Sequence, residues 1–112
     1  MKLVTLRELC IVCGVSRRAV QGYEKHGLLK PAGKNSRGHL LYGDDEVSKV
    51  KRIKLMQDFG FQVREIADVI GMDPSEAAQA FAEKKKMKES EREKLDRTIR
   101  LLDEMIKQAK KE

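Results

Sequence analysis

Two adjacent arginines, Arg17 and Arg18, follow a Gly-Val-Ser turn at the predicted start of a short helix. At such a position a guanidinium group can bind a phosphate, and it can also form two hydrogen bonds with the edge of a guanine base. This chemistry requires an element that carries the start of the helix into the major groove of DNA. The surrounding sequence indicates which element this is.

Residues 5–29 predict two short helices joined by a tight turn. Thr5 begins a sequence with the spacing of a capping box, and Gly14 favours the left-handed conformation that ends a helix. Ser16 is a favourable cap for the second helix, which is predicted to end at Gly27. This order is the pattern of the helix-turn-helix, whose second helix enters the major groove. It is also compatible with a two-helix corner in any small helical protein.

The positive charge of the chain is concentrated in and after this segment. Residues 1–43 contain eight basic and two acidic residues, a net charge of +6, whereas residues 44–112 contain 16 of each. A localised basic patch is typical of a surface that binds a polyanion. A surface that serves solubility alone gives no reason for such segregation.

The composition argues against several classes of protein. The 112 residues suit one domain with an appendage, and they contain no apolar run long enough to span a membrane. The N-terminus lacks the apolar region of a signal peptide, so we expect a cytoplasmic protein. His26 and His39 do not belong to a convergent set with Asp and Ser. We therefore predict no catalytic residues and no enzymatic activity.

Cys10 and Cys13 form a C-x-x-C pair inside the first predicted helix. Such a pair can be half of a zinc site or a redox couple. It is also compatible with two inert and mostly buried thiols, which is the interpretation that we favour. We therefore predict no metal site and no cofactor. A thiol-based metal or redox sensor stays as an alternative function.

Residues 29–42 predict a small hairpin after the two helices. Pro31 prevents the chain from continuing as a helix, and a turn cluster of Gly, Asn and Ser contains Lys34 and Arg37. The sequence HLLY that follows can form a strand. A hairpin at this place is a wing, and its basic tip can lie along the phosphate backbone beside the recognition helix.

Two further helices are predicted over residues 46–59 and 63–70. Asp44 or Asp45 is the expected cap of the first of them. Apolar residues at helical spacing are expected to face the core. They are Val47, Val50, Ile53 and Leu55 in the first helix, and Val63, Ile66, Val69 and Ile70 in the second.

One long helix is predicted from Pro74 to the end of the sequence, with Asp73 as its cap and no later Gly or Pro. Apolar residues in its second half recur in steps of four and three, which is the heptad pattern of a coiled coil. A lone helix cannot bury such a seam, so we expect a partner helix. Packing of Phe81 against the preceding domain is the alternative for the first turns. The seam consists of Leu95, Ile99, Leu102 and Ile106.

Over residues 3–71 the sequence resembles the MerR family of transcriptional regulators, because several motifs of that family occur in order and at the right spacing. The later helix is similar to the linker helix of the multidrug-responsive branch. The motifs are Gly14-Val15-Ser16, Tyr23-Glu24, Gly27-Leu28-Leu29-Lys30-Pro31, Gly38-His39-Leu40-Leu41-Tyr42, Phe59-Gly60-Phe61 and Glu65-Ile66.

The resemblance implies a mainly α fold, with a winged helix-turn-helix domain in residues 1–71 and a dimerisation helix in residues 72–112 that forms an antiparallel coiled coil. It implies a homodimer that binds double-stranded DNA at a pseudo-palindromic promoter site. Distortion of the DNA between the half-sites would then act indirectly on RNA polymerase. The expected DNA-binding residues are Ser16, Arg17, Arg18, Gln21, Tyr23, Lys34, Arg37, His39 and Arg64, and the expected dimerisation residues are Leu95, Ile99, Leu102 and Ile106.

The sequence departs from the family pattern in three places. Gln21-Gly22 replaces Arg-Tyr in the recognition helix, and His39-Leu40 replaces Tyr-Arg in the wing. No effector-binding domain follows the long helix in this sequence. We expect these changes to alter the DNA sequence that is read and the response to ligands. An excisionase-like architectural factor is the alternative DNA-binding function, although that class lacks a long dimerisation helix.

Overall fold

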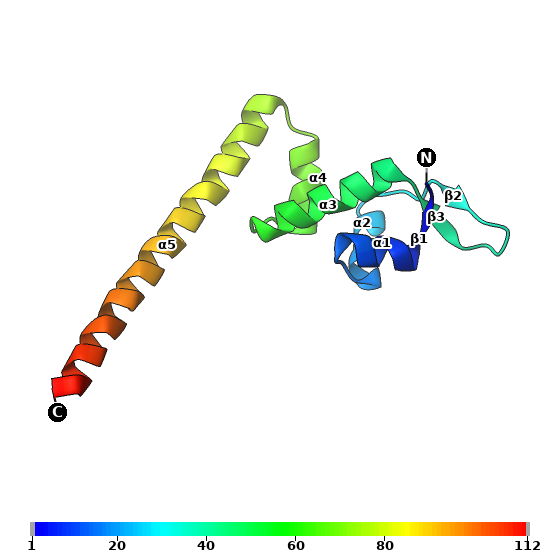
Figure 1. Ribbon diagram of the computed structural model, residues 1–112. Coiled ribbons are helices and arrows are strands. Elements are labelled where there is room, and N and C mark those ends of the chain that lie inside the picture. Colours follow the sequence, from blue (N-terminus) through cyan, green and yellow to red (C-terminus); the bar gives the residue numbers. More distant parts are fainter. Residues whose placement is uncertain (1, 112) are drawn as a thin grey trace. The chain divides into compact units, whose positions relative to one another are not determined.

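The computed structural model describes residues 2–111, which form two compact units that divide between Met72 and Asp73 (Figure 1). Helices dominate both units, and the first also contains a small sheet. The predicted mainly α fold, with a winged helix-turn-helix followed by a long helix, is confirmed. The elements are β1 (Val4–Thr5), α1 (Leu6–Cys13), α2 (Arg17–Lys25), β2 (Gly33–Lys34), β3 (Leu40–Tyr42), α3 (Asp44–Asp58), α4 (Val63–Ile70) and α5 (Pro74–Lys111).

The sheet has three short antiparallel strands in the order β1-β3-β2. The register pairs Val4 with Tyr42 on one side of β3 and Lys34 with Leu40 on the other. β3 therefore pairs both with β1, near the start of the chain, and with β2, the other strand of the hairpin. In Figure 1 this β2–β3 hairpin projects away from helices α1 to α4, as a wing does.

Helix caps account for most of the boundaries in the first unit. The capping box at Thr5 is confirmed, since the Glu8 backbone N–H donates to Thr5 Oγ1 over 3.3 Å and the Thr5 N–H donates to Glu8 Oε1 over 3.1 Å. Gly14 ends α1 with a φ of 66°, in the left-handed region that favours glycine. Ser16 caps α2 by accepting a 3.0 Å hydrogen bond from the Ala19 N–H. The turn between α1 and α2 is therefore fixed from both sides.

The predicted cap of α3, Asp44 or Asp45, is wrong by one or two positions. Gly43 is the cap, and its N–H donates to Glu46 Oε1 over 2.8 Å. Asp44 and Asp45 instead lie in the first turn of the helix. Carboxylates are favourable there because they face the positive end of the helix dipole. The two acidic residues thus stabilise the same helix start from inside it.

The core of the first unit is apolar and draws on every helix in it. The expected inward residues Val50, Ile53, Ile66 and Val69 are buried, but Leu55 is 51% exposed and Ile70 is 65% exposed, so those two predictions are wrong. Met56 and Phe61 take their place. Met56 lies three residues after Ile53, about 300° around the helix, so it stays near the buried face. Leu55 lies two residues after Ile53, about 200° around the helix, so it faces away from the core. The core residues are Leu9, Cys13, Val20, Tyr23, Leu29, Tyr42, Val50, Ile53, Met56, Phe61, Ile66 and Val69.

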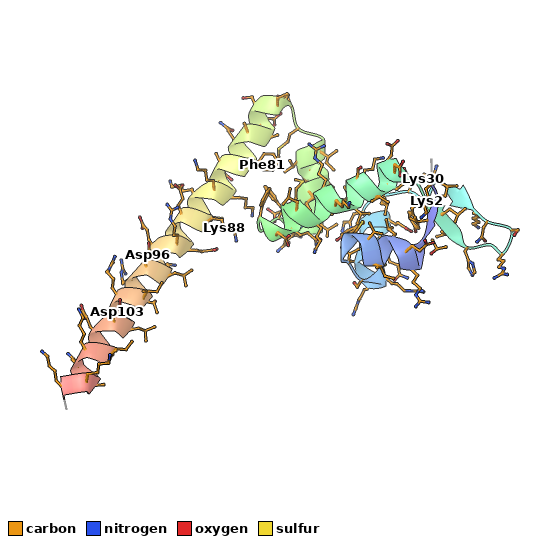
Figure 2. All side chains as sticks on the ribbon, viewed as in Figure 1. Lys2, Lys30, Phe81, Lys88, Asp96 and Asp103 are labelled. Carbon is orange, nitrogen blue, oxygen red and sulfur yellow. The ribbon has the colours of Figure 1, made fainter. Side chains whose placement is uncertain are left out.

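The second unit is the single helix α5. Asp73 caps it, accepting a 2.9 Å hydrogen bond from the Glu76 N–H, and Pro74 occupies the first helical position, as predicted. Figure 2 shows the side chains along this helix and labels Phe81, Lys88, Asp96 and Asp103. None of the described residues of α5 is buried. Within residues 2–111, every helix is too short or too polar to cross a membrane.

Candidate nucleic-acid interface

The recognition helix α2 presents one continuous polar face. Successive helical residues are about 100° apart, so Arg17, Gln21, Lys25 and Arg18 fall within a sector of about 100°. All four side chains are exposed. This face carries three cations and one amide group, which is the donor set used against guanine edges, adenine edges and phosphates.

The opposite side of α2 holds the helix in the domain. Val20 and Tyr23 are buried there, and Ala19 is half-buried. The polar face is therefore turned outward by packing of the apolar face. Arg17, Arg18 and Gln21 were predicted site residues, and the structure brings them together on one surface. Lys25 was not predicted, although its spacing of four residues from Gln21 could have indicated it.

Tyr23 is placed differently from the sequence prediction, which assigned it to the DNA backbone. Its side chain is 1% exposed, and its hydroxyl donates a 2.7 Å hydrogen bond to Gln57 Oε1 on α3. Burial raises the pKa of Tyr23, so the hydroxyl keeps its proton and stays a donor. We assign Tyr23 to the core, where it fixes α2 against α3, and leave it out of the proposed DNA contacts.

Ser16 lies at the exposed start of α2. Its hydroxyl oxygen already accepts the capping bond from Ala19. The hydroxyl hydrogen is still available for donation, because a hydroxyl can donate once and accept twice. Ser16 can therefore cap the recognition helix and donate to a phosphate at the same time.

The wing has a defined tip built around Asn35. Asn35 Oδ1 accepts hydrogen bonds from the backbone N–H groups of Arg37, over 2.9 Å, and His39, over 3.0 Å. Gly38 completes the turn with a φ of 81°. This local network holds the tip in one shape. Lys34, Arg37 and His39 are all exposed on it, so the three predicted wing residues lie together.

The predicted site residue Arg64 and the unpredicted Lys30 lie outside α2 and the wing tip. Arg64 is exposed in the first turn of α4, a separate element. Lys30, labelled in Figure 2, is exposed in the segment between α2 and β2. Exposed cations therefore lie on α2, on the segment that follows it and on the wing, and Arg64 lies apart from these on α4.

The two cysteines occupy the inner side of α1. Cys13 is buried with its sulfur 3.8 Å from the backbone oxygen of Val47, and Cys10 is half-buried. Burial raises the pKa of the Cys13 thiol, which lowers the fraction of reactive thiolate. Both cysteines are free of disulfides. Within residues 2–111, no group of three or more His, Cys, Asp and Glu side chains could hold a metal ion.

The comparisons with known proteins agree with this geometry. The model of the MerR HTH regulatory protein family matches residues 4–72. A mercuric resistance operon regulatory protein of Bacillus cereus is 34% identical over 65 residues, which are 58% of this chain and 49% of that protein. The chain thus spans about half the length of this relative.

Two solved structures share the fold over most of the chain. A MerR-family transcriptional regulator from Bacillus cereus superposes with a TM-score of 0.77 and 26% identity, covering 99% of this chain and 85% of that one. HiNmlR, a MerR-family regulator lacking the sensor domain and bound to promoter DNA, superposes with a TM-score of 0.69 and 20% identity, covering 88% of this chain and 79% of that one. The family match over residues 4–72 shows that the chain belongs to the MerR family of helix-turn-helix regulatory proteins.

Proposed function

We propose that this protein is a transcriptional regulator that binds a specific DNA site as a homodimer. The observation that carries the proposal is the exposed cationic face of α2, which is followed in the chain by a wing whose tip also carries cations. A recognition helix and a wing are the two elements with which such domains read bases and hold the backbone. The comparison structure bound to promoter DNA supports the same use of the fold.

The proposed contacts divide by the element that carries them. Arg18 and Gln21 are on the helix face and are assigned to base edges in the major groove. Lys34 and Arg37 are on the wing and are assigned to phosphates, which position the protein but carry no sequence information. The remaining candidates for phosphate contacts are Ser16, Arg17, Lys25, His39 and Arg64.

The dimer is proposed to form through α5, in residues 72–112, while residues 1–71 bind DNA. The seam residues Leu95, Ile99, Leu102 and Ile106 are 52–63% exposed, so the chain by itself leaves them in solvent. If two copies of α5 pair antiparallel with the centre between Ile99 and Leu102, then Ile99 of each subunit lies against Leu102 of the other subunit. Leu95 of each subunit then lies against Ile106 of the other. Four apolar side chains from each chain would then be covered.

A two-fold dimer presents two recognition helices to one DNA duplex, so its site is a pseudo-palindrome. By its family, the protein is proposed to distort the DNA between the half-sites and thereby to affect RNA polymerase indirectly. Deformation of this kind adds specificity at base pairs that the protein does not touch.

The assignment of bases to Arg18 and phosphates to Arg37 can be tested by measuring affinity against salt. Arg37→Ala should weaken binding to operator and random DNA alike, and should lower the salt slope by about 2 for a dimer that loses one phosphate contact per subunit. Arg18→Ala should reduce the difference in binding free energy between operator and random DNA by about 1–3 kcal/mol per half-site. Unchanged specificity in the Arg18 variant and in a matching Arg17→Ala variant would contradict base reading by the start of α2. An asymmetric single site bound by a monomer would favour an architectural factor.

A further inference from the structure

A buried tyrosine links the wing to the recognition helix. Tyr42 lies in β3, the central strand of the sheet, and its side chain is fully buried. Its hydroxyl donates a 2.7 Å hydrogen bond to Glu24 Oε1 on α2. The bond therefore joins the strand that carries the wing to the helix that carries the proposed base contacts.

Tyr23, the residue before Glu24 on α2, makes a similar hydrogen bond to a different element. Tyr23 donates to Gln57 on α3, so two consecutive residues of α2 fix the helix against α3 and against β3. Packing alone can hold a helix against a core, but it is not directional. Two hydrogen bonds at different points restrict the rotation of the helix about its own axis.

The Glu24–Tyr42 bond is stronger than its solvent-exposed equivalent would be. Its donor is fully buried and its acceptor is half-buried, where the dielectric is lower than in water. Hydrogen bonds to a charged acceptor are also shorter and stronger than those between neutral groups. Burial and the neighbouring Glu24 carboxylate raise the pKa of Tyr42, so the hydroxyl stays a donor at physiological pH.

We propose that Glu24 and Tyr42 are a positioning pair, which holds the wing at a fixed place relative to the recognition helix so that both engage one DNA site together. The inference rests on the proposed function and deepens it. Neither residue belongs to the cationic face of α2 or to the exposed wing tip. The pair acts by positioning two other residues, Arg18 on the recognition helix and Arg37 on the wing.

The physical reason for such a pair is preorganisation. A wing that is already in place binds its phosphate with a high effective concentration once the helix has docked. A wing that is free to swing must be ordered on binding, and that entropy cost reduces its contribution to affinity. Loss of the pair should therefore weaken the contribution of the wing, even though every wing residue is still present.

The test is a double-mutant cycle between Tyr42→Phe and Arg37→Ala. Affinity is measured for the DNA site that the unmodified protein selects from a random pool. Tyr42→Phe removes the hydroxyl and keeps the ring in the core. Arg37→Ala should cost about tenfold in affinity in the unmodified protein. In the Tyr42→Phe background the same change should cost less than about threefold, because the wing no longer docks efficiently. A role in stability alone would leave the cost of Arg37→Ala the same in both backgrounds.

Two variants of Glu24 serve as matched controls. Glu24→Gln keeps a neutral side-chain oxygen that can accept a weaker hydrogen bond from Tyr42, so Arg37→Ala should cost more in this background than in Tyr42→Phe. Glu24→Ala removes the acceptor without changing the core, so it should reproduce the loss of coupling, and it replaces Tyr42→Phe if that variant fails to fold. Equal costs of Arg37→Ala in all backgrounds would overturn the positioning pair. Failure of the unmodified protein to select any DNA would instead overturn the proposed function.

Discussion

The adjacent leucines Leu101 and Leu102 give a sharp test of the proposed dimer. They are 51% and 56% exposed in the isolated chain, so an Asp substitution disturbs the helix itself almost equally at either position. Their side chains point about 100° apart, and only Leu102 belongs to the seam. We predict that Leu102→Asp gives a monomer, whereas Leu101→Asp stays a dimer.

The magnitude follows from the exposure of the seam. In the proposed register Leu102 packs against Ile99 of the partner subunit, and two-fold symmetry repeats this contact once more. Complete burial of a leucine contributes roughly 1.5–3 kcal/mol, so covering the exposed half contributes about 1 kcal/mol for each copy. A carboxylate buried there without a partner costs several kcal/mol more. A total loss of about 5 kcal/mol raises the dimer dissociation constant more than about a thousandfold.

Sedimentation velocity over a concentration series measures this change directly. The unmodified protein and Leu101→Asp should show the same dimer, and Leu102→Asp should sediment as a monomer with weaker operator binding. The double variant Ile99→Asp with Leu102→Asp should be monomeric at every concentration. A dimer that persists in the double variant, or that is lost equally in Leu101→Asp, would show that the interface is not this seam.

The remaining predictions concern the thiols, a helix cap and the core. Changing both Cys10 and Cys13 to Ala should leave operator affinity within a few-fold and the zinc content unchanged; stoichiometric zinc that disappears with the change would contradict inert thiols. A backbone hydrogen bond lowers the pKa of Asp73 from its ordinary 3.8, so its capping contribution is complete above that pH and is lost as the pH falls through the lower folded value. Circular dichroism should accordingly show acid fraying of α5 that is absent in Asp73→Ala. Tyr23→Phe, which loses the bond to Gln57, should lower the free energy of unfolding by about 1 kcal/mol in urea titrations. An unchanged value would show that this bond adds no net stability.

Local signals made the helix boundaries predictable from the sequence. The capping box at Thr5, the left-handed Gly14 and the Asp73-Pro74 start each depend on residues within one turn of each other. Such features are fixed by nearby backbone groups, so a one-dimensional sequence contains them. The cap of α3 was missed because Gly43 has no capping side chain, and the neighbouring Asp44 offered a better apparent signal.

Long-range contacts explain what the sequence did not reveal. Tyr23 was expected at the DNA surface because nothing near it in the chain indicates Gln57, which lies 34 residues away. Leu55 was expected in the core because the sequence does not show which apolar residue of α3 meets a neighbouring element. The Glu24–Tyr42 bond crosses 18 residues and was not foreseen at all. The exposed cations, by contrast, were largely predictable, because long charged side chains seldom lie in a core.

Selection of bound DNA from a random pool tests the central claim most directly, because it reports sequence preference and symmetry in one measurement. A homodimer with the recognition helix α2 should enrich two inverted half-sites at one fixed spacing, and Arg18→Ala should relax preference at defined base pairs in each half-site. Enrichment of a single asymmetric half-site would contradict the dimer, and no enrichment over the starting pool would contradict sequence-specific DNA binding.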